Sequence, residues 1–247
     1  MFGIINHKLF KKKKLLFISV LLLAFACSKD DEAVNSTKEF QLGVYGTQEW
    51  TIVNASHTTY RDGTPIPQVS NKPEWYKLKT GAWCYIDNDP SKEKLYNWYA
   101  FMGIHDRDAN TPNKEFAPEG YHRPTYDEWQ TFYEFLTENG FDNAHKKGKA
   151  IASNSGWEFI EIDGTVGNDQ ETNNITGFNA LPVGKRNNAT DHIYAGDFQG
   201  AGLYTAFWQL WEEDSRCVIM DLDYNTGLTA AQGNLEHQGM SVRFIKD

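Results

Sequence analysis

The sequence predicts an α+β domain in which short strands outnumber helices. Three observations lead to this prediction. Runs of β-prone residues are short and end at turn-forming residues. One stretch, residues 125–140, has both the capping residues and the apolar spacing of a helix. No internal repeat or low-complexity break divides residues 42–247, a length sufficient for one hydrophobic core.

The strand predictions rest on alternation and on turn residues. Within residues 48–53, Trp50 and Ile52 fall on one face. The pair Asp62-Gly63 predicts a turn, because glycine adopts positive φ at little cost. A buried aromatic segment is expected at 95–101 and a strand at 82–86. Two further strands are expected at 217–224 and 240–245, joined through the segment 225–239.

Thr125 and Glu128 predict the start of the helix. They form a Thr-x-x-Glu capping box, in which each side chain accepts a hydrogen bond from the other residue's backbone. Gly140 is expected to end the helix. Apolar residues at i, i+3, i+4 and i+7 then form one buried stripe: Trp129, Phe132, Tyr133 and Leu136.

The N-terminus resembles a bacterial lipoprotein export signal. The cationic run Lys11–Lys14 precedes an apolar block, Leu15–Ala26, that is shorter than the about 20 residues of a membrane-spanning helix. Ala26 stands directly before Cys27, which the resemblance predicts to be lipidated, although Ala24-Phe25 departs from the usual pattern. An ordinary secretory signal cleaved nearby is the alternative.

The chain is therefore divided into a signal segment at 1–26, a polar tether at 27–41 and one domain at 42–247. We expect a cell-envelope protein anchored in the outer membrane through the lipid on Cys27. The acidic cluster Asp30–Glu32 resembles the surface-export signal of some lipoproteins and predicts display on the outer face.

Charge argues against a nucleic-acid partner. The chain has 24 basic and 33 acidic residues, a formal net charge of −9. Residues 1–26 hold five lysines and no acidic residue, so their removal makes the charge −14. An acidic domain without a basic stretch offers nothing to a phosphate backbone.

Several segments, taken in order, resemble the Fibrobacter succinogenes major paralogous domain. These segments are Glu49-Trp50-Thr51, Asp62–Pro67, Thr80–Tyr85, Lys94–Ala100, Ala117–Thr125 with Glu128-Trp129, Gly177–Pro182 and Ser241–Asp247. The resemblance implies an exported bacterial protein with a C-type-lectin-like fold, similar to the formylglycine-generating-enzyme group. That fold would have a twisted antiparallel sheet, flanking helices and long irregular loops. The chain departs from the family at Phe244, where cysteine is common, and at Tyr204-Thr205-Ala206, where Trp-Ser-Ser is common.

Acidic pairs are the candidate metal ligands. The best of them is Asp87-Asn88-Asp89, whose oxygen atoms would suit Ca²⁺. Asp106/Asp108 and Asp221/Asp223 have the same spacing. The alternative for each is turn chemistry, in which Asp and Asn accept hydrogen bonds from the nearby backbone. No other cofactor is expected.

Two histidines of the domain are candidate catalytic or metal-binding residues. His105 and His122 lack the spacing of a zinc motif, and His122 is expected to be a structural hydrogen-bonding residue.

Four aromatic residues are the candidate ligand-binding surface. Tyr204, Phe207, Trp208 and Trp211 lie within eight residues, after a glycine-rich loop. Exposed aromatic rings stack on sugars, so the cluster predicts a glycan platform. The same spacing also fits one buried face of a helix, and the core is the more common place for tryptophan in such a domain.

The two cysteines of the domain, Cys84 and Cys217, suggest a disulfide. Because the family's usual C-terminal cysteine is Phe244 here, Cys217 could replace it if strands 217–224 and 240–245 were neighbours. The alternative is that both are small buried apolar residues.

Three functions are consistent with the sequence. The first is a non-catalytic surface module that binds a glycan or a protein, favoured because no catalytic motif is present. The second is an enzyme related to the formylglycine-generating group, and the third is a purely structural surface component. The sequence sets neither the ligand nor the oligomeric state.

Overall fold

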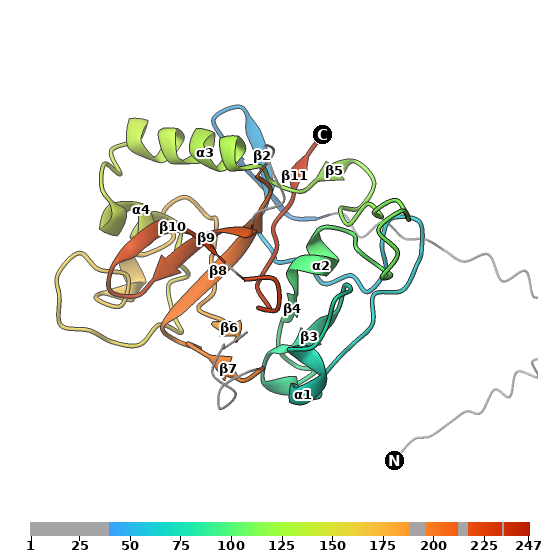
Figure 1. Cartoon of the computed structure of the whole chain (residues 1–247). Helices are drawn as coiled ribbons and strands as arrows, with labels where there is room; N and C mark the ends of the chain where they lie inside the picture. Colours follow the sequence, from blue (N-terminus) through green and yellow to red (C-terminus); the bar gives the residue numbers. More distant parts are fainter. Residues whose placement is uncertain (1–39, 188–195, 212–216, 234) are drawn as a thin grey trace, which may run out of the picture. The chain divides into compact units, whose positions relative to one another are not determined.

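A computed structural model describes residues 40–187, 196–211, 217–233 and 235–247 (Figure 1). Residues 39–247 belong to one compact unit. The predicted signal segment, 1–26, and most of the predicted tether, 27–41, lie outside the described residues. Within the described part, no helix has the length and apolar character needed to cross a membrane.

Antiparallel sheets and short helices make up the domain, which confirms the predicted α+β class. One sheet has the strand order β1-β2-β11-β5 and a second has the order β10-β9-β8, while β3-β4 and β6-β7 are two-stranded. The strands are β1 (Leu42–Tyr45), β2 (Gln48–Thr51), β3 (Trp83–Tyr85), β4 (Lys94–Tyr96), β5 (Tyr121–His122), β6 (Lys185–Arg186), β7 (Phe198–Gln199), β8 (Tyr204–Gln209), β9 (Cys217–Asp223), β10 (Gly227–Gly233) and β11 (Ile245–Lys246).

The longest helix begins where the capping box predicts. The Thr125 hydroxyl accepts a hydrogen bond from the Glu128 N–H at 3.2 Å, and the Glu128 carboxylate accepts one from the Thr125 N–H at 2.8 Å. Gly140, with φ of 91°, follows its end. The helices are α1 (Lys72–Trp75), α2 (Trp98–Phe101), α3 (Tyr126–Glu138) and α4 (Ala144–Ile151).

Helices α3 and α4 pack on one face of the three-stranded sheet and form a large aromatic core there. The Trp129 ring of α3 lies 5.9 Å from the Phe207 ring of β8, and Gly148 of α4 approaches Leu222 of β9. Trp50 of β2 packs on Trp129 at 4.5 Å between ring centroids. This core therefore connects α3 to both main sheets.

The C-terminal strands differ from the prediction. The segment 217–224 forms β9 as expected, but its partner is β10, which lies inside the predicted connection 225–239. Most of the predicted strand 240–245 makes only isolated bridges. The reason is the turn after β9. The Asp223 carboxylate accepts hydrogen bonds from the N–H groups of Asn225 and Thr226, and Gly227 adopts φ of 83°, which closes a tight hairpin between β9 and β10.

A buried arginine holds the C-terminal segment in place. Arg243 is 1 % exposed and donates hydrogen bonds to Asn54 Oδ1 at 2.7 Å, to the Thr51 carbonyl at 3.0 Å and to the Asn179 carbonyl at 3.1 Å. Its guanidinium lies 4.9 Å from the centre of the Phe178 ring. Burial lowers the pKa of Arg243 to about 10, so the group remains charged at neutral pH.

Candidate functional site

The predicted aromatic platform is not a surface. Residues 204–209 form strand β8, so the alternative of a single helical face is also wrong. Phe207 and Trp208 are both fully buried, on opposite faces of the strand. The Trp208 ring lies 5.2 Å from that of Trp98, and its indole N–H donates to the Tyr96 carbonyl at 2.8 Å. Neither ring can stack on a sugar.

The two outer members of that cluster are half-buried. The Tyr204 ring is covered by the Lys185 ammonium at 5.2 Å, and the Trp211 ring packs edge-on against Tyr126 at 4.6 Å. Tyr204 begins β8, whereas Trp211 follows its end. The four aromatic side chains are therefore not gathered into one binding face.

The predicted disulfide is not formed in this structure: Cys84 and Cys217 are free thiols. They belong to separate core clusters, Cys84 with Trp75 and Cys217 with Trp208. The disulfide prediction required strands 217–224 and 240–245 to be neighbours. They are not, because the neighbours of β9 are β8 and β10 and not the segment that contains Phe244. Burial raises the pKa of Cys84 to about 11 and that of Cys217 to about 12, so both are protonated at neutral pH.

Asp87, Asn88 and Asp89 form a turn. Asp87 and Asn88 adopt left-handed φ values of 53° and 57°. The Asp87 carboxylate pairs with Lys92 at 2.6 Å, and Asp89 accepts hydrogen bonds from both the backbone and the hydroxyl of Ser91. The described residues contain no group of three or more His, Cys, Asp or Glu side chains placed to hold a metal. Ca²⁺ binding here stays a prediction.

His122 has the structural hydrogen bonds expected of it. Its two ring nitrogens lie 2.7 Å from the carboxylates of Glu128 and Asp247. Burial alone would lower the pKa of His122, but these two carboxylates outweigh burial and raise it. His122 thus ties the start of α3 to Asp247, the residue after β11.

The loop between α2 and β5 lines a hollow of the domain surface. This loop is closed at its base, because the Lys114 N–H donates to the Gly103 carbonyl at 2.9 Å. Gly103 adopts φ of 75°, and a Cβ there would lie 1.8 Å from the Lys114 carbonyl oxygen. The Gly81 N–H also donates to the Ile104 carbonyl at 2.7 Å. We call residues 103–114 the His105 loop.

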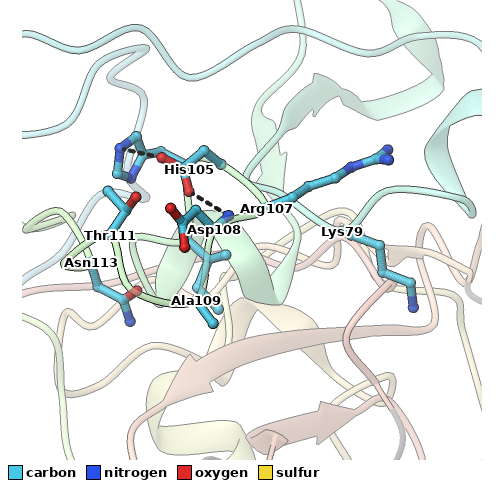
Figure 2. A pocket seen from close by; sticks show the side chains of 9 residues that line it. Lys79, His105, Arg107, Asp108, Ala109, Thr111 and Asn113 are labelled. Atoms are coloured by element: carbon cyan, nitrogen blue, oxygen red, sulfur yellow. Dashed lines mark hydrogen bonds and ion pairs between the residues drawn. The ribbon is translucent and has the colours of Figure 1, made fainter.

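The acidic side chains of the His105 loop shape its backbone. Asp106 accepts a hydrogen bond from the Asp108 N–H, and Asp108 accepts one from the Asn110 N–H, both at 2.9 Å. Asp106 also lies 3.4 Å from the His105 imidazole (Figure 2). The spacing that suggested a metal site at 106–108 thus makes consecutive turns.

A pocket of about 440 Å³ lies on one side of His105. A second hollow, of about 440 Å³, shares His105, Thr111 and Asn113 with the first. Because the two hollows share these three residues, we call them together the His105 pocket. The first is lined by Lys79, Ile104, His105, Asp106, Arg107, Asp108, Ala109, Thr111 and Asn113.

The charged groups of the pocket fall into two kinds. In the second hollow, Asp62 pairs with Lys114 at 2.6 Å, and this hydrogen bond holds the pKa of Asp62 well below its usual range. Glu115 pairs with Arg123 at 3.3 Å. In contrast, the exposed cation Arg107 has no hydrogen bond or ion pair with another described residue.

Lys79, Thr111 and Asn113 likewise have side chains without a hydrogen bond to the described residues. Figure 2 shows Lys79 and Arg107 extending away from the hydrogen-bonded cluster of acidic residues. The lining of the first hollow thus holds two cations, Lys79 and Arg107, and two carboxylates, Asp106 and Asp108. Sequence reasoning noted His105 and the acidic pair but did not combine them, although Gly103 and the polar run 105–114 were signals of a functional loop.

One of the comparisons with known proteins found a match. A family model described as the Fibrobacter succinogenes major domain matches residues 44–246, almost the whole of the compact unit. No curated protein and no solved structure matches the chain.

Proposed function

The chain belongs to the Fibrobacter succinogenes major domain family, and from this we propose that it is a non-catalytic binding or adhesion module of a surface lipoprotein. The family resemblance supports an exported protein with a C-type-lectin-like arrangement. In such a molecule the ligand would be a glycan or another surface protein. This assignment of function rests on a site and not on the fold alone.

The single observation that carries the proposal is the pocket around His105. Binding residues are commonly found on loops that a rigid scaffold holds in place. The His105 loop fits this description, because its base is closed between Gly103 and Lys114 and it follows the buried helix α2. The first hollow of the pocket has a volume of about 440 Å³, which lies within the range of roughly 300–1,000 Å³ typical of small-molecule sites.

The state of the cysteines favours binding over the enzymatic alternative. Oxidase chemistry of the formylglycine-generating group uses a pair of cysteines. Cys84 and Cys217 lie in separate clusters, and burial keeps both thiols protonated. A buried thiol without a thiolate is a poor nucleophile. Catalysis through this pair is therefore disfavoured.

Ligand screening tests the binding function. Purified full-length protein is applied to a glycan array and to whole-cell surface extracts, in parallel with Ala109→Trp, which fills the pocket from an exposed position. Thr226→Trp, in the exposed β9–β10 turn, is the matched control. We expect a ligand that the wild type and the control retain and Ala109→Trp loses. Equal binding by all three would reject the pocket, and the absence of any ligand would favour a structural component.

Membrane anchoring is a separate part of the proposal. Its support is the Lys11–Lys14 run, the short apolar block and Ala26-Cys27, which lie outside the described residues. We expect Cys27→Ser to move the protein out of the detergent phase or to leave it unprocessed. Unchanged partitioning of that variant would reject lipid attachment at Cys27.

A further inference from the structure

We propose that His122 is a proton-dependent latch. When protonated, it clamps the C-terminal end of strand β11 to the start of helix α3, and when it loses a proton it releases that clamp. The latch is independent of the proposed binding function, since His122 is not among the residues that line the His105 pocket.

The two contacts of the His122 imidazole require a proton on each ring nitrogen. Nδ1 lies 2.7 Å from a carboxylate oxygen of Asp247, and Nε2 lies 2.7 Å from one of Glu128. A neutral imidazole has one N–H donor and a lone pair on its second nitrogen, whereas an ionised carboxylate only accepts. In a neutral ring, one of the two contacts would therefore set a nitrogen lone pair against a carboxylate oxygen. The imidazolium donates on both sides.

Glu128 is an acceptor on both of its oxygens. One oxygen accepts hydrogen bonds from the N–H and from the hydroxyl of Thr125, both at 2.8 Å. The other oxygen faces the His122 ring. The capping box of α3 and the latch thus share a single carboxylate, which joins the state of His122 to the first turn of the helix.

The other charged side chains beside the ring have partners elsewhere. Arg123, the next residue along the chain, pairs with Glu115 at 3.3 Å, and Lys246 of β11 lies 3.3 Å from Glu49 of β2. Among the described residues, the charged groups within ion-pair distance of the imidazole are the carboxylates of Glu128 and Asp247. The electrostatic surroundings of the ring therefore favour its protonated form.

The sign of the pH dependence follows from these contacts. Burial lowers the pKa of His122, but the hydrogen bonds to Asp247 and Glu128 outweigh it, so the pKa lies above its ordinary value of 6.5. A group whose pKa is raised in the folded state stabilises that state when protonated. This contribution is complete below pH 6.5 and is lost as the pH rises through the folded pKa.

The latch acts where the chain has few other ties. Strand β11 has two residues, of which Ile245 pairs with Trp50 on one side and with His122 on the other. Beyond the strand, the Asp247 N–H donates to the Gly120 carbonyl at 3.1 Å. Deprotonation of His122 removes the side-chain tie of Asp247 and leaves this backbone bond, so the end of the strand opens more often at high pH.

An NMR titration of the histidine rings in purified full-length protein tests the latch, with His122→Gln to assign the signal. We expect the His122 ring to titrate above pH 6.5 and Asp247→Asn to lower its midpoint. Asp142→Asn is the matched control, because it removes a carboxylate from an exposed pair with Lys146 beyond the other end of α3. The control should leave the midpoint unchanged. A midpoint at or below 6.5, or one that Asp247→Asn does not move, would overturn the proposal.

A double-mutant cycle separates a proton-dependent latch from a merely structural contact. Urea denaturation at pH 6 and pH 9 gives the unfolding equilibrium constants of the wild type, His122→Gln, Asp247→Asn and the double variant. We expect a coupling of about twofold to fivefold in the equilibrium constant at pH 6, the size of a partly exposed ion pair, and none at pH 9. Equal coupling at both pH values would mean a contact that needs no second proton, and no coupling at either would mean no contact in solution. Each of these two results would overturn the latch.

Discussion

Strand β8 and the His105 loop differ in what holds them and in what they expose. Strand β8 contains the aromatic side chains that a sugar site would use, yet Phe207 and Trp208 are fully buried between two core clusters. The His105 loop contains few apolar residues, and its shape depends on hydrogen bonds to its own backbone. In this domain, aromatic content therefore marks the core, whereas polar groups without a partner in the described residues mark the surface.

The largest loss of stability is expected for a substitution in β8. Trp208→Ala should lower the free energy of unfolding by about 3–5 kcal/mol, because it leaves a cavity and removes the hydrogen bond to the Tyr96 carbonyl. Urea denaturation measures the loss. Trp208→Phe, which keeps an aromatic ring, should cost less. Native-like stability of the alanine variant would mean that the ring is not part of the core.

Gly103→Ala tests whether the base of the His105 loop is packed as tightly as strand β8. The new Cβ would meet the Lys114 carbonyl oxygen at 1.8 Å, with φ of 75°. We expect a loss of about 1–3 kcal/mol, together with weaker ligand binding. Gly63→Ala is the matched control, because Gly63 has φ of 84° but no atom within 4 Å of an added Cβ. Equal losses in both would show that close packing at Gly103 contributes nothing.

Asp221 lies opposite Ala206 of β8 and should make the stability of this region depend on pH. Burial raises the pKa of Asp221 to about 6, while Lys185 lowers it and Asp223 raises it. The folded state thus favours the protonated carboxyl. This contribution is complete below the unfolded pKa of 3.8 and is lost as the pH rises through about 6.

Asp221→Asn should therefore match the wild type at pH 3.5 and be more stable by roughly 1–2 kcal/mol at pH 8. Thermal unfolding of both proteins across that range measures the difference. If the difference in stability between Asp221→Asn and the wild type is constant with pH, or becomes smaller as the pH rises, the pKa of Asp221 is not raised.

The smallest effect on stability is expected at the pocket. Lys79→Gln and Arg107→Gln should each change the free energy of unfolding by less than about 0.5 kcal/mol, because neither side chain has a hydrogen bond or ion pair with the described residues. Urea denaturation of both variants measures the change. A loss above about 1 kcal/mol would indicate a structural role for the cation.

Local signals in the sequence were sufficient for some elements. Helix α3 was predicted with its first turn, because the Thr125–Glu128 capping box and the apolar stripe act within a few residues. The strands at 48–53 and 82–86 were also predicted, and β2 and β3 lie within them. In each of these cases the pattern of nearby side chains decides the structure.

Other elements depend on partners that are distant in sequence. Residues 227–233 contain glycine and alanine and have little intrinsic tendency to form a strand, yet they pair with β9 along its whole length. The spacing of residues 204, 207, 208 and 211 could not distinguish a helix from a strand, nor a surface from the core. The His105 pocket was missed because its shape depends on contacts from Gly81, Arg61 and Lys114, which sequence patterns do not connect.

Strand β11 has a consequence for the order in which the domain assembles. Ile245 pairs with Trp50 on one side and with His122 on the other, so β11 joins segments separated by most of the domain. Such long-range pairing slows folding, since nearly the whole chain must be available before the central sheet can form. The three-stranded sheet ends with residue 233, so the sheet that contains β11 is the later of the two main sheets that a chain growing from its N-terminus can complete.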